Sequence, residues 1–138
     1  MGKKINLSYI AGFFDGDGCV SLSNKGLRVI LTNCDRKTLG DVFDFFKVRG
    51  KINSKLRTKK DIYVKKCYQL VYWNKQAEII LKELLPYLRQ KKSQARLALK
   101  FQKTYLVEHR GRGKKLSLDI IEKRKSLIEQ VKEAKWII

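Results

Sequence analysis

The first stretch of the chain has the hydrophobic spacing of an amphipathic helix. Apolar residues recur at intervals of three and four from Leu7 to Phe14, and Asn6 or Ser8 can serve as the N-cap. The pattern ends at an Asp-Gly-Asp-Gly sequence over residues 15–18. We therefore predict a short helix with one broad apolar face.

Alternation of apolar and polar positions next predicts two hairpins. Residues 19–25 alternate up to a turn at residues 24–26, and residues 27–33 alternate after that turn. Residues 51–73 alternate in the same way and predict a second, longer hairpin. A period of two places one side of each strand on a core and the other side in solvent.

Further helices are predicted between and after the hairpins. Asp35 is expected to cap the first of them. A second helix is expected after Asn74 as its cap, and it ends at Pro86 because proline lacks an N–H group. Two helical stretches follow, over about residues 93–108 and 117–136.

This order of elements predicts one α+β domain over residues 1–138. The core, about residues 5–108, has the order αββαββα, and a helical tail follows over about residues 116–138. Both hairpins are expected in one antiparallel sheet with the helices on one face. The other face would then be an uncovered, polar and basic saddle.

The charge of the chain points to a polyanionic partner. The 138 residues include 32 Lys and Arg but only 13 Asp and Glu, which gives a formal charge of +19. Nucleic acid is the commonest partner of so basic a protein. The longest apolar stretch is far too short for a membrane span, and no secretory signal is recognisable. We expect an intracellular protein of a prokaryotic cytoplasm or an organelle, not secreted and with no membrane partner.

Cysteine and histidine are too sparse for several common chemistries. The three cysteines contain no Cys-x-x-Cys pair and His109 is the single histidine, which argues against structural zinc and against Ser-His-Asp or Cys-His hydrolysis. An odd number of cysteines indicates thiols in a reducing compartment, acting as small buried hydrophobic residues. Catalysis would then depend on carboxylates, metals and lysines.

The second hairpin concentrates the positive charge. Nine Lys or Arg and a single acid lie between Lys47 and Gln69. A two-stranded ribbon fits the DNA major groove, where Arg28 and Arg57 match guanine edges, Asn53 and Gln69 match adenine, and lysines match phosphates. The residues that we expect to contact DNA are Ser21, Ser23, Lys25, Arg28, Ile30, Thr32, Lys51, Asn53, Lys55, Arg57, Lys59, Tyr63, Lys65, Cys67 and Gln69.

Asp15 and Asp17 stand together in a region that is otherwise rich in cations. A calcium loop counted from Asp15 fails, because Val20 and Gly26 occupy the positions that require glycine and glutamate. Two interpretations stay open. One is a plain turn, and the other is a carboxylate that holds a hard divalent cation against a phosphodiester.

Residues 10–18, Ile-Ala-Gly-Phe-Phe-Asp-Gly-Asp-Gly, resemble the LAGLIDADG motif of homing endonucleases, with Ile10 in place of the usual Leu. The predicted order of elements is similar to the αββαββα core of that family, and the resemblance covers roughly residues 5–105. The motif occurs once. In this family a single motif implies a homodimer, whereas single-chain members carry two motifs.

The resemblance also implies a metal site and a dimer contact. Asp17 would bind Mg²⁺, for which Mn²⁺ can substitute, the Gly16 carbonyl would be a further ligand, and Asp15 would be a structural cap. Two copies of the motif helix would pack across a two-fold axis and bring both Asp17 carboxylates together. The residues that we expect at the dimer interface are Leu7, Ile10, Ala11, Gly12 and Phe14.

Further catalytic residues follow from the same resemblance. Asn33, at the end of the second predicted strand, would position a water molecule. Lys37 and Lys91 would support the water network and the phosphate, with Arg36 and Lys92 as neighbouring alternatives. A phosphate clamp or a solvated cation is as compatible with these lysines as a catalytic role.

The implied function is a sequence-specific, double-strand DNA homing endonuclease. It would act as a metal-dependent homodimer on a long, near-palindromic site and would be encoded within an intron or intein. Two alternatives remain, an RNA-binding intron maturase and a DNA-binding regulator that has lost cleavage. The presence of Asp17, Asn33 and Lys91 favours the enzyme over the regulator.

Overall fold

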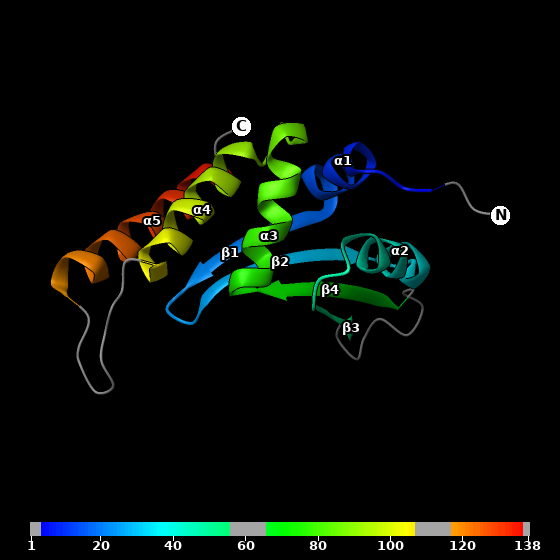
Figure 1. The fold of residues 1–138 in the computed structure, drawn as a ribbon, viewed down its shortest axis with the longest axis horizontal. Coiled ribbons are helices and arrows are strands. Elements are labelled where there is room, and N and C mark those ends of the chain that lie inside the picture. The colour runs from blue at the N-terminus through cyan, green and yellow to red at the C-terminus, as the bar shows by residue number, and fades with distance from the viewer. Residues whose placement is uncertain (1–3, 56–65, 107–116, 137–138) are drawn as a thin grey trace.

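The computed structural model describes residues 4–55, 66–106 and 117–136 (Figure 1). In chain order the elements are α1 (Leu7–Asp17), β1 (Gly18–Ser23), β2 (Gly26–Asn33), α2 (Arg36–Phe46), β3 (Lys51–Lys55), β4 (Cys67–Trp73), α3 (Asn74–Leu84), the 3₁₀ turn η1 (Leu85–Tyr87), α4 (Lys92–Leu106) and α5 (Leu118–Trp136). The predicted αββαββα order, followed by further helices, is confirmed.

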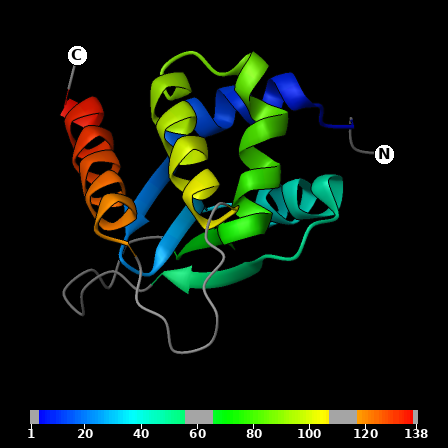
Figure 2. The ribbon, with the colours of Figure 1, turned by 60° about the vertical axis from the view of Figure 1, so that its left-hand side comes forward.

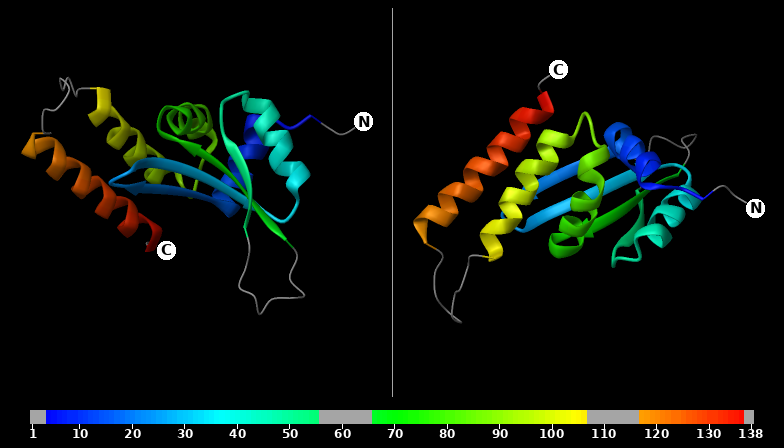
Figure 3. Two further views of the ribbon diagram at one scale, coloured as in Figure 1. Left: turned by 90° about the horizontal axis from the view of Figure 1, so that it is seen from below. Right: turned by 45° about the horizontal axis from the view of Figure 1, so that its top comes forward.

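The strands of the described residues form one antiparallel sheet in the order β1-β2-β4-β3. The two hairpins meet where β2 pairs with β4, with Ile30 opposite Val71. Seen from the helix side (Figure 3, right), α3 and α4 cross in front of the strands. These helices therefore cover one face of the sheet, and alternate residues of each strand lie on the opposite face.

The core fills the space between the sheet and the helices. Leu27, Val29 and Leu31 of β2 are fully buried and belong to one cluster with Ile80 and Leu81 of α3. Each large apolar side chain buried in this way contributes about 1.5–3 kcal/mol. Because β2 supplies every second residue to this cluster, the residues between them are left on the uncovered face.

Two of the predicted N-caps are present. The Tyr9 N–H donates to Asn6 Oδ1 at 2.8 Å, and the Lys37 N–H donates to Asp35 Oδ1 at 3.2 Å. Side-chain oxygens at these positions satisfy backbone donors that have no partner within the helix. Both caps are local, which is why the sequence alone identified them.

The predicted cap at Asn74 is wrong. Asn74 is the first residue of α3, with φ of 48°, and no side chain caps this helix. Its Oδ1 atom accepts a hydrogen bond from the Leu27 N–H at 3.2 Å. Gly26, with φ of 119°, lies so close to this amide that a Cβ atom would collide with it. Asn74 therefore ties the start of β2 to the start of α3.

The interpretation of residues 15–18 as a turn is also wrong. Helix α1 continues through Asp17, and Gly18 is already the first residue of β1. The Gly18 N–H donates to the Phe14 carbonyl, and a Cβ atom at Gly18 would collide with the Phe14 ring. The chain therefore passes directly from helix to strand, which holds Asp17 at the junction.

Helix α5 packs against α4 and along the edge strand β1 (Figure 2). Leu127 and Val131 are its buried residues. The Arg124 guanidinium lies 3.8 Å from the centre of the Tyr105 ring, and its Nε donates to Thr104 Oγ1 at 2.8 Å. Among the described residues, no helix is long and apolar enough to cross a membrane.

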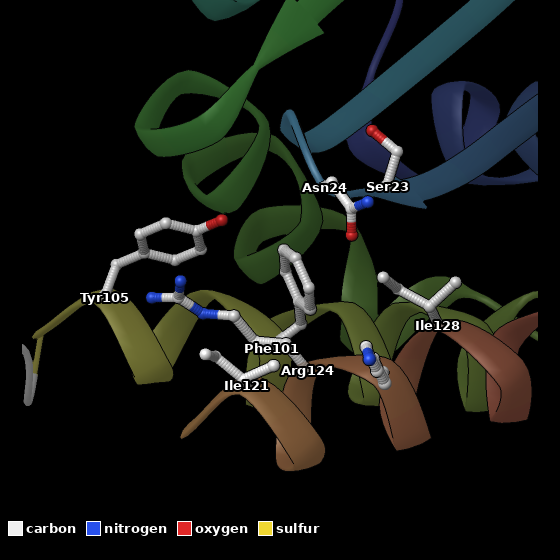
Figure 4. A pocket seen from close by; sticks show the side chains of 8 residues that line it. Ser23, Asn24, Phe101, Tyr105, Ile121, Arg124 and Ile128 are labelled. Atoms are coloured by element: carbon white, nitrogen blue, oxygen red, sulfur yellow. The ribbon is translucent and has the colours of Figure 1, made fainter. Parts of the chain in front are cut away.

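A cavity of about 220 Å³ lies between α4, α5 and the β1–β2 turn (Figure 4). Ser23 and Asn24 line it from the turn, and Phe101, Ile121 and Ile128 are among the apolar residues that complete its wall. Ser23 was expected to contact DNA. Ser23 therefore lies close to the tail helix, and its contact with DNA stays a prediction.

Candidate functional site

A hollow of about 310 Å³ lies where α1 ends and where β2 and β4 meet. Its wall is formed by Asp17, Thr32, Asn33, Cys34 and Cys67. Asp17 is exposed, and its carboxylate makes no hydrogen bond or ion pair with any described residue. The fold thus brings two of the predicted catalytic residues, Asp17 and Asn33, to one hollow.

Asp15 has a different environment, although it is only two residues away. Its carboxylate accepts hydrogen bonds from the Arg89 N–H at 2.8 Å and from the Lys91 N–H at 3.0 Å. Both donors lie between η1 and α4, far along the chain from α1. Asp15 therefore anchors the start of α4 and does not cap the end of its own helix.

The predicted lysines do not line this hollow. The Lys91 ammonium donates to the Asp15 carbonyl at 2.6 Å and so holds the last turn of α1 beside Gly16 and Asp17. Lys37 is exposed in the first turn of α2. Gly16 is exposed near the same end of α1, where its carbonyl role remains a prediction.

Asn33 is half-buried at the end of β2. Its Oδ1 atom accepts a hydrogen bond from the Asp35 N–H at 2.8 Å. The amide oxygen is therefore used to shape the turn between β2 and α2, and the amide nitrogen keeps its two donor hydrogens. Asn33 can thus donate to a water molecule or a phosphate oxygen in the hollow.

The exposed face of α1 differs from the expected dimer interface. Ile10, Ala11 and Phe14 are 0% exposed within one protomer, so these three side chains have no surface to offer a partner. They were expected at the interface because the resemblance implies that two motif helices pack together, but these residues form the apolar stripe of α1. The structure uses that stripe for the protein's own core, and Leu7 is half-buried beside it.

The opposite side of α1 carries small residues instead. Ser8, Gly12 and Gly16 are exposed and spaced four residues apart, so they share one helix face. A Cβ atom at Gly12 or Gly16 would meet nothing within 4 Å. Tyr9, half exposed, lies beside them, and its separation of three residues from Gly12 could be recognised in the sequence.

The uncovered face of the sheet can be described in rows across the strands. In one row Thr32, Gln69 and Asn53 lie side by side, and in another Arg28 lies between Ser21 and Trp73. The first row presents one hydroxyl and two amides. The second presents a guanidinium next to an indole that is 39% exposed.

The centre of this face is less polar than expected. Ile30 is half-buried and pairs with Val71, which is 5% exposed. Cys67, expected to contact DNA, is only 3% exposed and is covered at the end of the sheet. Val71 has a neighbour on each side, because it pairs with Ile30 of β2 and with Lys51 of β3.

Other predicted contacts lie at the rim. Lys51 is exposed on β3 and Lys25 is exposed in the β1–β2 turn. Four expected contact residues, together with the side chain of Lys55, lie outside the described part of the chain. These four are Arg57, Lys59, Tyr63 and Lys65.

The rim also contains residues that sequence reasoning missed. A hollow of about 460 Å³ beside β3 is lined by Arg49, Gly50, Lys51, Trp73 and Gln76. Two cations, an indole and an amide meet there, which suits a phosphate and its sugar. Trp73 follows Gln69 and Val71 in the alternation of β4, so its place on this face could have been predicted from the sequence.

Asp17 is the acidic residue in the wall of the hollow. No three His, Cys, Asp or Glu residues are grouped for metal binding within residues 4–55, 66–106 and 117–136. Mg²⁺ is usually bound by one or two carboxylates together with water and substrate phosphate. Asp17 offers one such carboxylate at the hollow, and metal binding there stays a prediction.

Solved structures of known proteins share this fold. The homing endonuclease I-CvuI in complex with its target is 17% identical over 96% of both chains, with a TM-score of 0.55. The archaeal intron-encoded homing endonuclease I-Vdi141I complexed with DNA is 16% identical, covers 93% of this chain and 82% of its own, and has a TM-score of 0.72. The fold is therefore that of the homing endonucleases.

The family follows from the sequence itself. Residues 4–85, more than half of the chain, match the family model described as a LAGLIDADG-like domain. The chain belongs to the LAGLIDADG family, as its motif indicated. No curated protein matches the sequence.

Proposed function

We propose that the protein is a homodimeric, sequence-specific DNA endonuclease that hydrolyses phosphodiester bonds with a divalent metal. The observation that carries this proposal is the position of Asp17. An exposed carboxylate without a partner among the described residues ends a helix whose outer face is lined by glycine. In a protein of charge +19, such a carboxylate is costly beside DNA unless a cation lies between them.

The dimer would form on the outer face of α1. The open space at Gly12 and Gly16 supports this, since two helices can approach closely where neither has a side chain. An isologous contact along this face would bring the two Asp17 carboxylates together at the helix ends. Each protomer would then complete the half-site of the other.

Mg²⁺, or Mn²⁺ in its place, fits this pair of carboxylates. Crystal structures of I-CvuI were obtained in the presence of Ca and of Mg, and DNA was not cleaved in the Mg complex with the I-CreI target. When bound, the metal would supply charge neutralisation at the scissile phosphate. The Gly16 carbonyl would add a further oxygen ligand.

The other residues of the hollow would orient water and substrate. The Asn33 amide would donate to a water or phosphate oxygen, because its own oxygen is engaged with Asp35. Lys91 acts as a positioning residue in this scheme, since its ammonium holds the backbone just before Gly16 and Asp17. Lys37, exposed at the start of α2, would reach a phosphate.

The uncovered sheet face would lie in the major groove of one half-site. Arg28, Gln69 and Asn53 carry the donors that match guanine and adenine edges, and they sit in two separate rows of the sheet. Two such sheets related by a two-fold axis would read a long, near-palindromic sequence. An intron origin, as printed for I-Vdi141I, is consistent with such a target.

The decisive experiment compares Asp17→Asn with Asp41→Asn, an exposed carboxylate on α2, as the matched control. The substrate is a duplex library incubated with Mg²⁺, and both cutting and binding are measured. Asp17→Asn should abolish cutting and retain binding, whereas Asp41→Asn should cut like the wild type. Cutting by Asp17→Asn at the wild-type rate would refute the site assignment.

Two outcomes would favour the alternatives. Tight duplex binding by the wild type without cutting in Mg²⁺ or Mn²⁺ would identify a DNA-binding regulator. Preference for a folded intron RNA over every duplex in the library would identify a maturase. In both cases Asp17→Asn would leave binding unchanged.

A further inference from the structure

Cys34 and Cys67 face each other across two strands. Their Sγ atoms are 2.9 Å apart. Asn33, the last residue of β2, pairs with Tyr68 of β4, so the continued antiparallel register brings Cys34 opposite Cys67. Cys67 is on the sheet face away from the helices, in line with Gln69, and Cys34 lies in the bend directly after β2.

The backbone at this position suits a disulfide. Residues directly opposite in antiparallel strands have Cα atoms about 4.5–5.5 Å apart, which lies within the range of about 4.4–6.8 Å for disulfides. The pairing register of β2 and β4 need not change for the two sulfurs to bond. Cys34 is exposed and Cys67 is buried. A dissolved oxidant can therefore react first with the Cys34 sulfur, and the Cys67 sulfur lies close enough to react with Cys34 afterwards.

The third cysteine is in a separate place. Cys19 lies on β1 opposite Ile30, and its Sγ accepts a hydrogen bond from the Lys135 ammonium at 3.6 Å. In the sheet order β2 lies between β1 and β4. Cys19 therefore serves as an internal control for any reaction of the pair.

We propose that Cys34 and Cys67 are a redox modification site that forms a reversible intramolecular disulfide in the wall of the Asp17 hollow. With oxidised glutathione, the Cys34 thiolate attacks one sulfur, and the glutathione S–S bond breaks. Cys67 then attacks Cys34 and releases the second glutathione. The two protein thiols lose two electrons and two protons, and one glutathione disulfide becomes two glutathione thiols.

The bond would alter the hollow itself. Both sulfurs line it together with Asp17, Thr32 and Asn33. Closing the Sγ–Sγ distance from 2.9 Å to a bond of about 2.05 Å draws the end of β2 toward the start of β4. It also encloses α2 and β3 in a covalent loop.

The effect of the disulfide on DNA cutting rests on the proposed function. A misplacement on the order of 1 Å can lower a catalytic rate about a hundredfold. We therefore expect the oxidised protein to cut DNA at least about tenfold more slowly than the reduced protein. Dithiothreitol should restore the rate.

The test uses the full chain as wild type, Cys19→Ser and Cys34→Ser. Each is treated with oxidised glutathione, quenched in acid, unfolded and labelled with iodoacetamide, and the labels are counted by intact mass. Oxidation should reduce the wild type from three labels to one and Cys19→Ser from two to none. A peptide map should show Cys34 joined to Cys67 within one chain.

Three results would overturn the proposal. They are three remaining labels in the oxidised wild type, a link between two chains, and a stable glutathione adduct on Cys34. In addition, oxidised glutathione should not change the rate at which Cys34→Ser cuts DNA. If the disulfide-linked wild type cuts DNA as fast as the reduced wild type, the proposed effect of the disulfide on cutting is refuted. The label count is readable even if the reduced protein cuts no DNA, so failure of the proposed function is distinguishable.

Discussion

Replacing Asp15 by alanine should destabilise the fold, whereas the same change at Asp17 should not. The Asp15 carboxylate accepts two backbone hydrogen bonds, at 2.8 and 3.0 Å, from the segment that precedes α4. The loss leaves the Arg89 and Lys91 N–H groups without this acceptor. Asp17 makes no such bond with any described residue.

The expected loss of stability on Asp15→Ala follows from these two hydrogen bonds. A hydrogen bond to a charged group contributes about 1.5–3 kcal/mol, and partial exposure of Asp15 places both bonds near the lower end. We expect Asp15→Ala to lower the free energy of unfolding by about 2–4 kcal/mol. For a domain of this size that corresponds to a fall in Tm of about 6–12 °C. Asp17→Ala should stay within about 0.5 kcal/mol of the wild type.

Urea unfolding at one fixed protein concentration measures both variants, because the apparent stability of the proposed dimer depends on concentration. Asp15→Asn is a useful third variant, since its amide keeps one acceptor oxygen and should show an intermediate loss. An Asp15→Ala midpoint equal to that of the wild type would refute the reasoning. So would an Asp17→Ala variant that is destabilised as strongly as Asp15→Ala.

Three further predictions concern the dimer, the DNA contact and the buried tyrosine. Gly12→Leu should leave the protomer folded, because a Cβ atom there meets nothing within 4 Å. Overpacking of about 1–3 kcal/mol should weaken the proposed dimer. Sedimentation velocity measures the dimer fraction, and an undiminished fraction would contradict the prediction. DNA affinity should fall about a thousandfold between 50 and 200 mM salt if roughly six phosphates are contacted; a titration series that shows no salt dependence would exclude the proposed interface. Burial raises the pKa of Tyr72, whose hydroxyl has no partner among the described residues. As the pH rises, Tyr72 therefore ionises in the unfolded chain before it ionises in the folded protein, and the wild type should lose stability above about pH 10. Unfolding curves of Tyr72→Phe should show equal or greater stability at pH 7 and a smaller loss of stability at alkaline pH.

The sequence by itself determined the features that depend on neighbours along the chain. The alternation in residues 19–33 predicted which side of the first hairpin is buried, and Val20, Leu27, Val29 and Leu31 are fully buried as expected. Asn6 and Asp35 cap their helices, and Pro86 ends α3 in a 3₁₀ turn. These outcomes are governed by periods of two and 3.6 residues and by contacts within about four residues.

Tertiary structure decided where each residue of the motif is used. The apolar stripe of α1 could have packed in the protein's own core or against a partner helix. It packs in the core, so Gly12 and Gly16 lie on the exposed side of the helix. Asp15 and Asp17 have the same chemistry in the sequence. They differ because Asp15 lies against Arg89 and Lys91, more than seventy residues away, whereas Asp17 lies over an open hollow.

The same reason applies to the remaining differences. Asn74 could have capped α3, but the approach of β2 gave its side chain the Leu27 N–H as a donor. Cys34 and Cys67 are 33 residues apart, and only the β2–β4 register places them face to face. Local patterns do not indicate which residues far apart in the sequence will contact one another, because those contacts depend on how whole elements pack together.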